Sequence, residues 1–185
     1  MKMKWLATPV IAIVLIPFAS AVPQEQGVTC GIIAKFEFHA WAELDPGFKP
    51  SVSGGPRNLT VEKVIPVNWS MGEKLNCTWR GDIVVRWIVR VHLACLAPFV
   101  IGLLKAELYN ESGEREDSCF ALTFTPAIST GVEKVVEMYL FSGSDFPIEK
   151  NTTVIKKTKF CAFLFPSAPP FKTPTLERAV IARFV

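Results

Sequence analysis

The sequence of 185 residues lacks most of the patterns that identify an enzyme or a metal-binding protein. It contains two histidines, no Cys-x-x-Cys or Cys/His pair at metal-binding spacing, no G-x-S-x-G motif and no glycine-rich phosphate loop. These absences argue against a zinc site, a nucleophile-elbow hydrolase and a phosphate-binding loop. Neither a metal nor a cofactor is expected.

Long apolar runs are missing from most of the chain, and so is a strong charge of either sign. No run of about 18 apolar residues occurs after residue 21, so no membrane-spanning helix is expected. The formal net charge is +3, and it falls to +1 without Lys2 and Lys4 of the N-terminal segment. A nearly neutral chain gives no electrostatic reason to expect a nucleic acid partner.

The N-terminus is the exception, because it has the pattern of a secretory signal peptide. Residues 1–4 are basic, 5–18 are apolar, and Ala19-Ser20-Ala21 fits a cleavage site. The sequence therefore predicts a signal peptide over residues 1–21 and a secreted, extracellular protein. The remaining residues, 22–185, are enough for one domain with its own hydrophobic core.

Asparagine occurs in this chain only within Asn-x-Ser/Thr triplets. By chance, all the asparagines of such a sequence would have this context on the order of once in 10⁴ to 10⁵ sequences. The triplets predict N-glycosylation, and each glycan must then lie on the surface. The predicted sites are Asn58, Asn68, Asn76, Asn110 and Asn151.

All the cysteines follow the predicted signal peptide, and they are Cys30, Cys77, Cys95, Cys119 and Cys161. In an oxidising compartment they predict two disulfides and one remaining thiol, with the pairing left open. The remaining thiol is either buried or bonded to a second chain, which would give a disulfide-linked dimer. Cys161, between Phe160 and Phe163, is the cysteine most suited to a buried position.

Apolar and polar residues alternate along most of the chain after the signal peptide, which is the pattern of half-buried β-strands. The clearest segments are 31–42 and 83–95. Further strands are predicted at 59–67, 100–109, 118–125, 132–141, 152–165 and 176–184. Residues 172–183 offer a helical alternative that would begin at Thr175. The expected fold is all-β: a single antiparallel sandwich of about seven to nine strands.

The segment V-R-V-H-L-A-C-L-A-P-F…K-A-E-L-Y-N-E, residues 89–111, resembles the opening of a transthyretin-like secreted domain. The matching positions are Cys95, Pro98, Leu108, Tyr109 and Glu111. Residues 135–141 are similar to a strand that the family carries downstream. The resemblance implies a secreted β-sandwich with a binding role and without catalysis.

Five polar side chains on two predicted strands have the composition of a small ribonuclease site. Alternation places Glu37 and His39 on the polar face of one strand, and Arg86, Arg90 and His92 on the polar face of the other. The histidines would transfer protons, and an arginine would stabilise the charge of the phosphorane. This requires the two strands to be neighbours in register. Otherwise the five residues are ordinary side chains of a solvated sheet face.

Aromatic residues are abundant, with 14 phenylalanines and five tryptophans. Two clusters stand out: Phe160, Phe163, Phe165 and Phe171, and Trp69, Trp79 and Trp87. These rings either fill the sandwich core or form a partner-binding patch or an apolar ligand pocket.

The combined features predict a secreted, N-glycosylated, disulfide-containing protein that binds an extracellular protein or glycan, as an effector or immune modulator would. A ribonuclease-like hydrolase that uses the two histidines is an alternative from another class. A carrier of an apolar ligand, with an enclosed cavity lined by phenylalanines, is a third.

Overall fold

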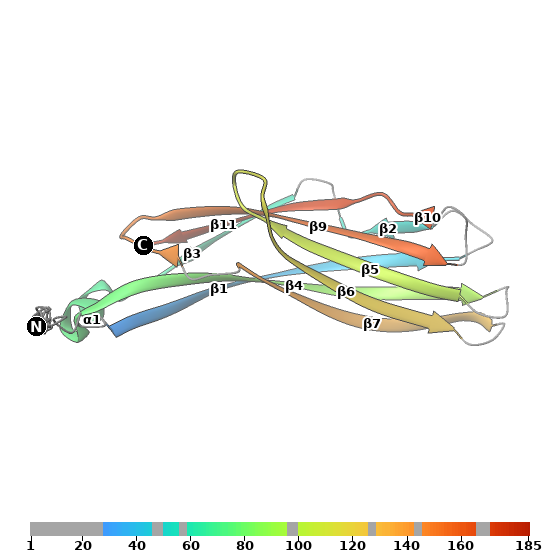
Figure 1. The fold of residues 1–185 in the computed structure, drawn as a ribbon, viewed down its shortest axis with the longest axis horizontal. Coiled ribbons are helices and arrows are strands. Elements are labelled where there is room, and N and C mark those ends of the chain that lie inside the picture. The colour runs from blue at the N-terminus through green and yellow to red at the C-terminus, as the bar shows by residue number, and fades with distance from the viewer. Residues whose placement is uncertain are drawn as a thin grey trace, which may run out of the picture.

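The structure is a computed structural model and describes residues 28–45, 50–55, 59–95, 100–125, 129–142, 146–165 and 171–185. In these residues the chain forms two β-sheets that pack face to face, with one short helix, α1, at one end (Figure 1). The predicted signal peptide and the predicted glycosylation site Asn58 lie outside the described residues.

The first sheet has the strand order β2–β1–β4–β7, and the short strand β8 also pairs with β4. Its strands are β1 (Val28–Leu44), β2 (Ser51–Ser53), β4 (Cys77–Cys95), β7 (Ser129–Phe141) and β8 (Phe146–Pro147). Strands β1 and β4 pair in parallel over the whole of β1, whereas β7 and β2 pair antiparallel with their neighbours.

The second sheet has the order β3–β11–β9–β5–β6, and the short strand β10 pairs with β9. Its strands are β3 (Leu59–Ile65), β5 (Val100–Tyr109), β6 (Arg115–Thr125), β9 (Thr153–Phe165), β10 (Phe171–Lys172) and β11 (Leu176–Phe184). Strands β3 and β11 pair in parallel, and the other pairs of this sheet are antiparallel.

The predicted all-β sandwich is confirmed, and each predicted strand segment is found, although β4 begins at Cys77, six residues before the expected start at 83. The helical alternative at 172–183 is wrong, because β11 occupies 176–184. The two parallel pairs differ from the antiparallel arrangement expected. Between β1 and β4 the chain crosses to the second sheet to form β3 and then α1 (Trp69–Leu75), and such a crossover allows parallel pairing.

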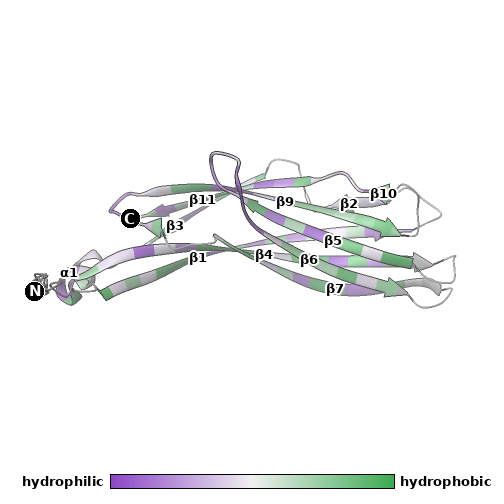
Figure 2. Cartoon of the chain, in the orientation of Figure 1, coloured by the Kyte–Doolittle hydropathy of each residue, from purple (hydrophilic) through white to green (hydrophobic). Residues whose placement is uncertain are grey.

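The core lies between the sheets and follows from strict alternation along the long strands (Figure 2). Phe36 and Phe38 of β1 point inward, and Trp87 of β4 is fully buried at the centre. The ring of Trp87 lies 5.1 Å from that of Phe38 and 5.4 Å from that of Phe160 on the opposite sheet. The contact between Trp87 and Phe160 joins the two sheets, and that between Phe38 and Trp87 lies within the first sheet.

One disulfide, Cys30–Cys77, links the beginnings of β1 and β4. Cys119 is half-buried and Cys161 is buried, as expected for Cys161, and both are free thiols. The side chain of Cys95 lies outside the described part of the chain. The second expected disulfide is therefore not formed among the four cysteine side chains that the structure describes.

Candidate functional site

The five residues of the proposed ribonuclease site all lie on the outer face of the first sheet. Strands β1 and β4 are neighbours, as that hypothesis required, and Glu37 pairs directly with Arg86 in the ladder. Arg86 bridges Glu37 at 3.0 Å and Glu137 of β7 at 2.5 Å, while His39 Nε2 lies 3.0 Å from Glu37. These contacts form a surface chain of alternating charges across three strands.

The pKa values of three side chains in this surface network shift as their hydrogen bonds predict. The hydrogen bond from Arg86 holds the pKa of Glu137 below its ordinary value, and the same bond raises the pKa of Arg86. The hydroxyl of Tyr139 donates to Glu137 at 2.9 Å, which raises the pKa of Tyr139. These groups are engaged with one another, as in a structural ion-pair network.

His92 belongs to a separate group of side chains further along the same face. Its Nδ1 lies 2.5 Å from Glu43, and its ring stacks on Trp41 with the ring centres 6.2 Å apart. Trp41 in turn donates from Nε1 to Glu43 at 3.1 Å.

The strand register separates the two histidines. His39 pairs with Ile88 and His92 with Glu43, so the histidines are four residues apart along the strands, or about 13 Å. A ribonuclease site needs both rings in contact with one phosphate. The structure thus brings together Glu37, His39 and Arg86 and leaves His92 in another group, beside Glu43.

The outer face of the second sheet carries a cluster of hydrophobic side chains that face away from the core. We call it the apolar face, and it consists of Ile101, Leu103, Phe120, Leu122, Phe124, Phe163 and Phe165. Ladder pairing aligns these residues in rows across β9, β5 and β6. Phe120 and Phe124 are each 55% exposed and Leu122 is 73% exposed, so the β6 edge of the face is open to solvent.

Three lysines surround the apolar face. Lys105 and Lys172 lie 5.7 and 5.8 Å from the ring centres of Phe120 and Phe163, and Lys134 of β7 lies 5.8 Å from that of Phe124. Such distances allow cation–π attraction. Lys134 and Lys172 therefore give the apolar face a basic margin, whereas Lys105 also pairs with Glu107 at 2.7 Å.

Sequence reasoning predicted the β6 strand but missed its outward hydrophobic side chains. Alternation in F-A-L-T-F, residues 120–124, would place the larger apolar residues in the core, yet Ala121 and Thr123 point inward instead. The predicted clusters are divided: Phe160 and Trp87 are in the core, Trp69 and Trp79 are partly buried, and Phe163 and Phe165 are on the apolar face.

The described asparagines of the predicted glycosylation sites are on the surface. Asn68 and Asn76 are exposed at the two ends of α1, where Asn68 accepts from the Met71 N–H and Asn76 has a left-handed backbone (φ 47°). Asn151 is exposed in a turn before β9, and Asn110 is half-exposed in the β5–β6 hairpin. Asn110 lies five residues, or about 17 Å along β5, from Lys105, which pairs with Phe120 at the near end of the apolar face.

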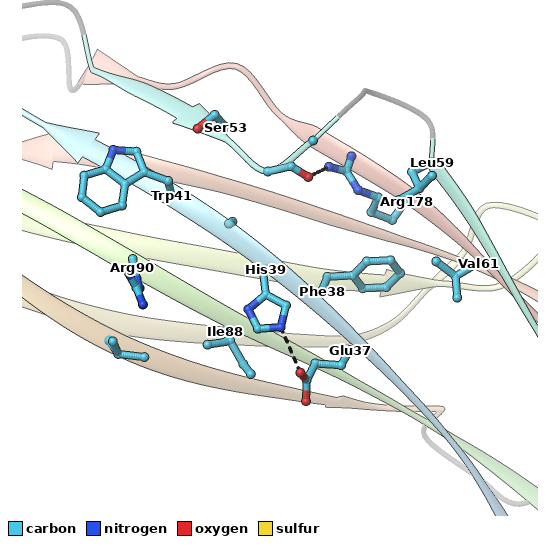
Figure 3. Close-up of a pocket in the computed structure, with 14 residues that line it drawn as sticks. Glu37, Phe38, His39, Trp41, Ser53, Leu59, Val61, Ile88, Arg90 and Arg178 are labelled. Carbon is cyan, nitrogen blue, oxygen red and sulfur yellow. Dashed lines mark hydrogen bonds and ion pairs between the residues drawn. The ribbon is translucent and has the colours of Figure 1, made fainter.

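A groove of about 760 Å³ opens at the side of the sandwich (Figure 3). It extends over β1, from residues around β2 and β3 to Ile88 and Arg90 of β4 and Val135 of β7 on the outer face of the first sheet. Two of the predicted site residues on β1, Glu37 and His39, line it together with Arg90. A carrier would need an enclosed cavity lined by phenylalanines. The groove is open, and Phe38 is the phenylalanine among the described residues that line it.

No protein-family model, no curated protein and no solved structure matches this chain. In the described residues, no helix is long and apolar enough to span a membrane. Nor do three or more His, Cys, Asp or Glu side chains gather at metal-binding distance within that part of the chain.

Proposed function

We propose that this chain is a secreted, N-glycosylated protein that acts by binding another extracellular protein through its apolar face. The single observation that carries the proposal is the exposure of Phe120, Leu122 and Phe124 on a sheet whose inner face already forms the core. Contiguous exposed apolar surface with a polar margin is typical of protein interaction sites.

The predicted glycosylation pattern also supports the apolar face as the binding surface. The exposed asparagines at 68, 76 and 151 lie next to α1 or before the start of β9, far along the strands from Phe163 and Phe165. Glycans at these positions would cover the end of the sandwich that carries α1 and leave the apolar face accessible. The lysines at its margin favour a partner with acidic residues around an apolar centre.

The test uses the full chain expressed and secreted by eukaryotic cells. Enzymatic removal of N-glycans followed by peptide mass spectrometry should identify glycans at the predicted asparagines. The protein is then tested for binding to an array of purified extracellular domains. Replacing Phe120, Leu122 and Phe124 together by serine should weaken the binding that is found by about tenfold or more, because central hydrophobic contacts dominate interface energies.

A matched control comes from the outer face of the first sheet. Ile33, Val135 and Phe141 are also exposed hydrophobic residues, and replacing them by serine should leave binding unchanged. Unmodified asparagines in the secreted protein would contradict the glycosylation proposal. Equal binding by both triple variants would place the interaction elsewhere and contradict the role of the apolar face.

A further inference from the structure

Strands β1 and β3 face each other at the side of the sandwich without forming a ladder. Strand β1 pairs with β4 along its whole length, but among the described residues its other edge pairs only with β2, at Trp41–Glu43. In the same part of the chain, β3 pairs only with β11. Within the described residues, β1 therefore has an unpaired edge before Trp41, and this edge forms one side of the groove.

Main-chain groups of β1 point to this edge. Lys63 Nζ of β3 donates to the Lys35 carbonyl at 2.6 Å, so that carbonyl points away from β4. Alternate residues of a strand direct their N–H and C=O groups to the same edge. The N–H groups of Glu37 and His39 therefore face the groove, and no described residue accepts a hydrogen bond from them.

The groove joins this backbone edge to apolar and cationic side chains (Figure 3). Phe38 points inward from β1, and Leu59 and Val61 of β3 form the opposite wall. Arg90 lies on the outer side and forms no ion pair with a described residue. A strand that occupied the groove would meet hydrogen-bonding groups along β1 and an apolar surface on its inward side.

Arg178 of β11 provides a buried positive charge at the wall of the groove. Its side chain is 2% exposed, and its guanidinium donates to the carbonyls of Gly54 and Glu177. None of the described carboxylates pairs with it. Burial lowers its pKa, since desolvation disfavours the charged form. A carboxylate in the groove would supply the missing counter-charge.

We propose that the groove binds an extended peptide segment of another protein, which adds to the edge of β1 beside Glu37 and His39 and places an acidic side chain against Arg178. Peptides commonly bind in this way to exposed sheet edges, with main-chain bonds for affinity and alternate side chains for specificity. In the bound segment, an inward acidic residue meets Arg178, and an inward apolar residue two positions away meets Phe38.

The backbone edge distinguishes a peptide from a lipid-like carboxylate. A fatty acid would match the apolar wall and Arg178, but it has no groups to pair with the N–H of Glu37 and His39. This site is separate from the apolar face, which lies on β9, β5 and β6, so either proposal stands without the other.

The test selects a displayed library of random octapeptides on the folded, glycosylated protein. Selection should enrich peptides that carry Asp or Glu at a fixed position, with an apolar residue two positions away. In fluorescence anisotropy, replacing that acid by its amide should weaken binding by about tenfold or more. Hydrogen exchange of the unaltered protein should show new protection at the amides of Glu37 and His39 when the peptide is bound.

Three variants examine the role of Arg178. Arg178→Gln should abolish the preference for the acidic peptide over its amide, and Arg178→Lys should keep part of it. Arg183→Gln is the control, because Arg183 lies on the same strand but is exposed and pairs with Glu62 at 2.9 Å. Circular dichroism establishes that each variant is folded.

Several results would overturn the proposal. These are a selection without an acidic consensus, equal affinity for the acid and amide peptides, and protection that misses Glu37 and His39. The last two measurements use the unaltered protein, so they decide the matter even if Arg178→Gln does not fold. Retention of sodium oleate without any peptide would identify a lipid site instead.

Discussion

The indole N–H of Trp87 donates to the hydroxyl of Thr158 at 2.9 Å, and this hydrogen bond joins the two sheets through the core. Both residues are fully buried, and the Thr158 hydroxyl donates onward to the Glu107 carbonyl at 3.0 Å. Trp87 thus combines a large apolar ring with a satisfied polar group. These two hydrogen bonds connect residues of β4, β9 and β5.

Replacing Thr158 by valine should destabilise the protein by about 1–3 kcal/mol, because it leaves the Trp87 N–H buried without an acceptor. Urea unfolding measures the change. In a Trp87→Phe background, the same Thr158→Val change should cost less, since the donor is already absent. Equal costs in the two backgrounds would show that the hydrogen bond does not contribute to stability.

Removing the Cys30–Cys77 disulfide should cost about 4 kcal/mol, because the bond closes a loop with a sequence separation of 47 residues. The double serine variant is compared with the unaltered protein by urea unfolding. Cys119→Ser removes a free thiol instead and should have a much smaller effect. A double variant as stable as the parent protein would mean that the disulfide does not restrict the unfolded chain.

Glu107 should make stability depend on acid pH. Burial alone would raise its pKa, but hydrogen bonds and charge from Lys105, with further bonds from Tyr109 and Arg115, lower it below 4.5. The unfolded chain therefore binds the proton more readily. The stabilisation is present above the unfolded pKa and is lost as the pH falls through the folded pKa.

Unfolding curves between about pH 6 and about pH 3 measure this effect. The parent protein should lose more stability over this range than Glu107→Gln, which cannot titrate at this position. Glu62→Gln is a control at an exposed ion pair. If Glu107→Gln and the parent protein show parallel pH profiles, the folded-state pKa of Glu107 is not lowered.

Cys161 should react slowly with iodoacetamide in the folded protein, because burial raises the pKa of its thiol and blocks access. Cys119 is more exposed and should be labelled faster. Peptide mass spectrometry of briefly treated samples measures both sites. In denaturant the two rates should converge, and equal rates in the folded protein would contradict the burial of Cys161.

Much of the strand arrangement could be predicted because alternation is a local property. In 31–42 and 83–95 the buried faces were identified correctly, as Phe36, Phe38 and Trp87 show. Strand partners and direction could not be predicted in this way, since they depend on where the intervening chain crosses between the sheets. The parallel pairing of β1 and β4 is the clearest example.

The candidate sites could likewise be predicted only in part from the sequence. Alternation placed Glu37, His39 and His92 on polar faces, but only the register between β1 and β4 separated the two histidines. The alternation pattern favoured a core position for Phe120 and Phe124, yet both are exposed. A hydrophobic residue on an outward face has the same local sequence pattern as one in a core. Alternation with Leu176 and Val180 places Arg178 on the buried face of β11, but only the tertiary structure shows that its guanidinium donates to Gly54, distant in the chain, and meets no carboxylate among the described residues.

The amino-acid sequence by itself determined that this protein is built of strands with one buried side, because that pattern repeats within each segment. It also predicts secretion and glycosylation, through signals that cellular machinery reads from short stretches of chain. Only the tertiary structure decided which outer face is hydrophobic, which strand edge is open and which charge is buried. Each of these depends on contacts between segments far apart in sequence, which no local pattern contains.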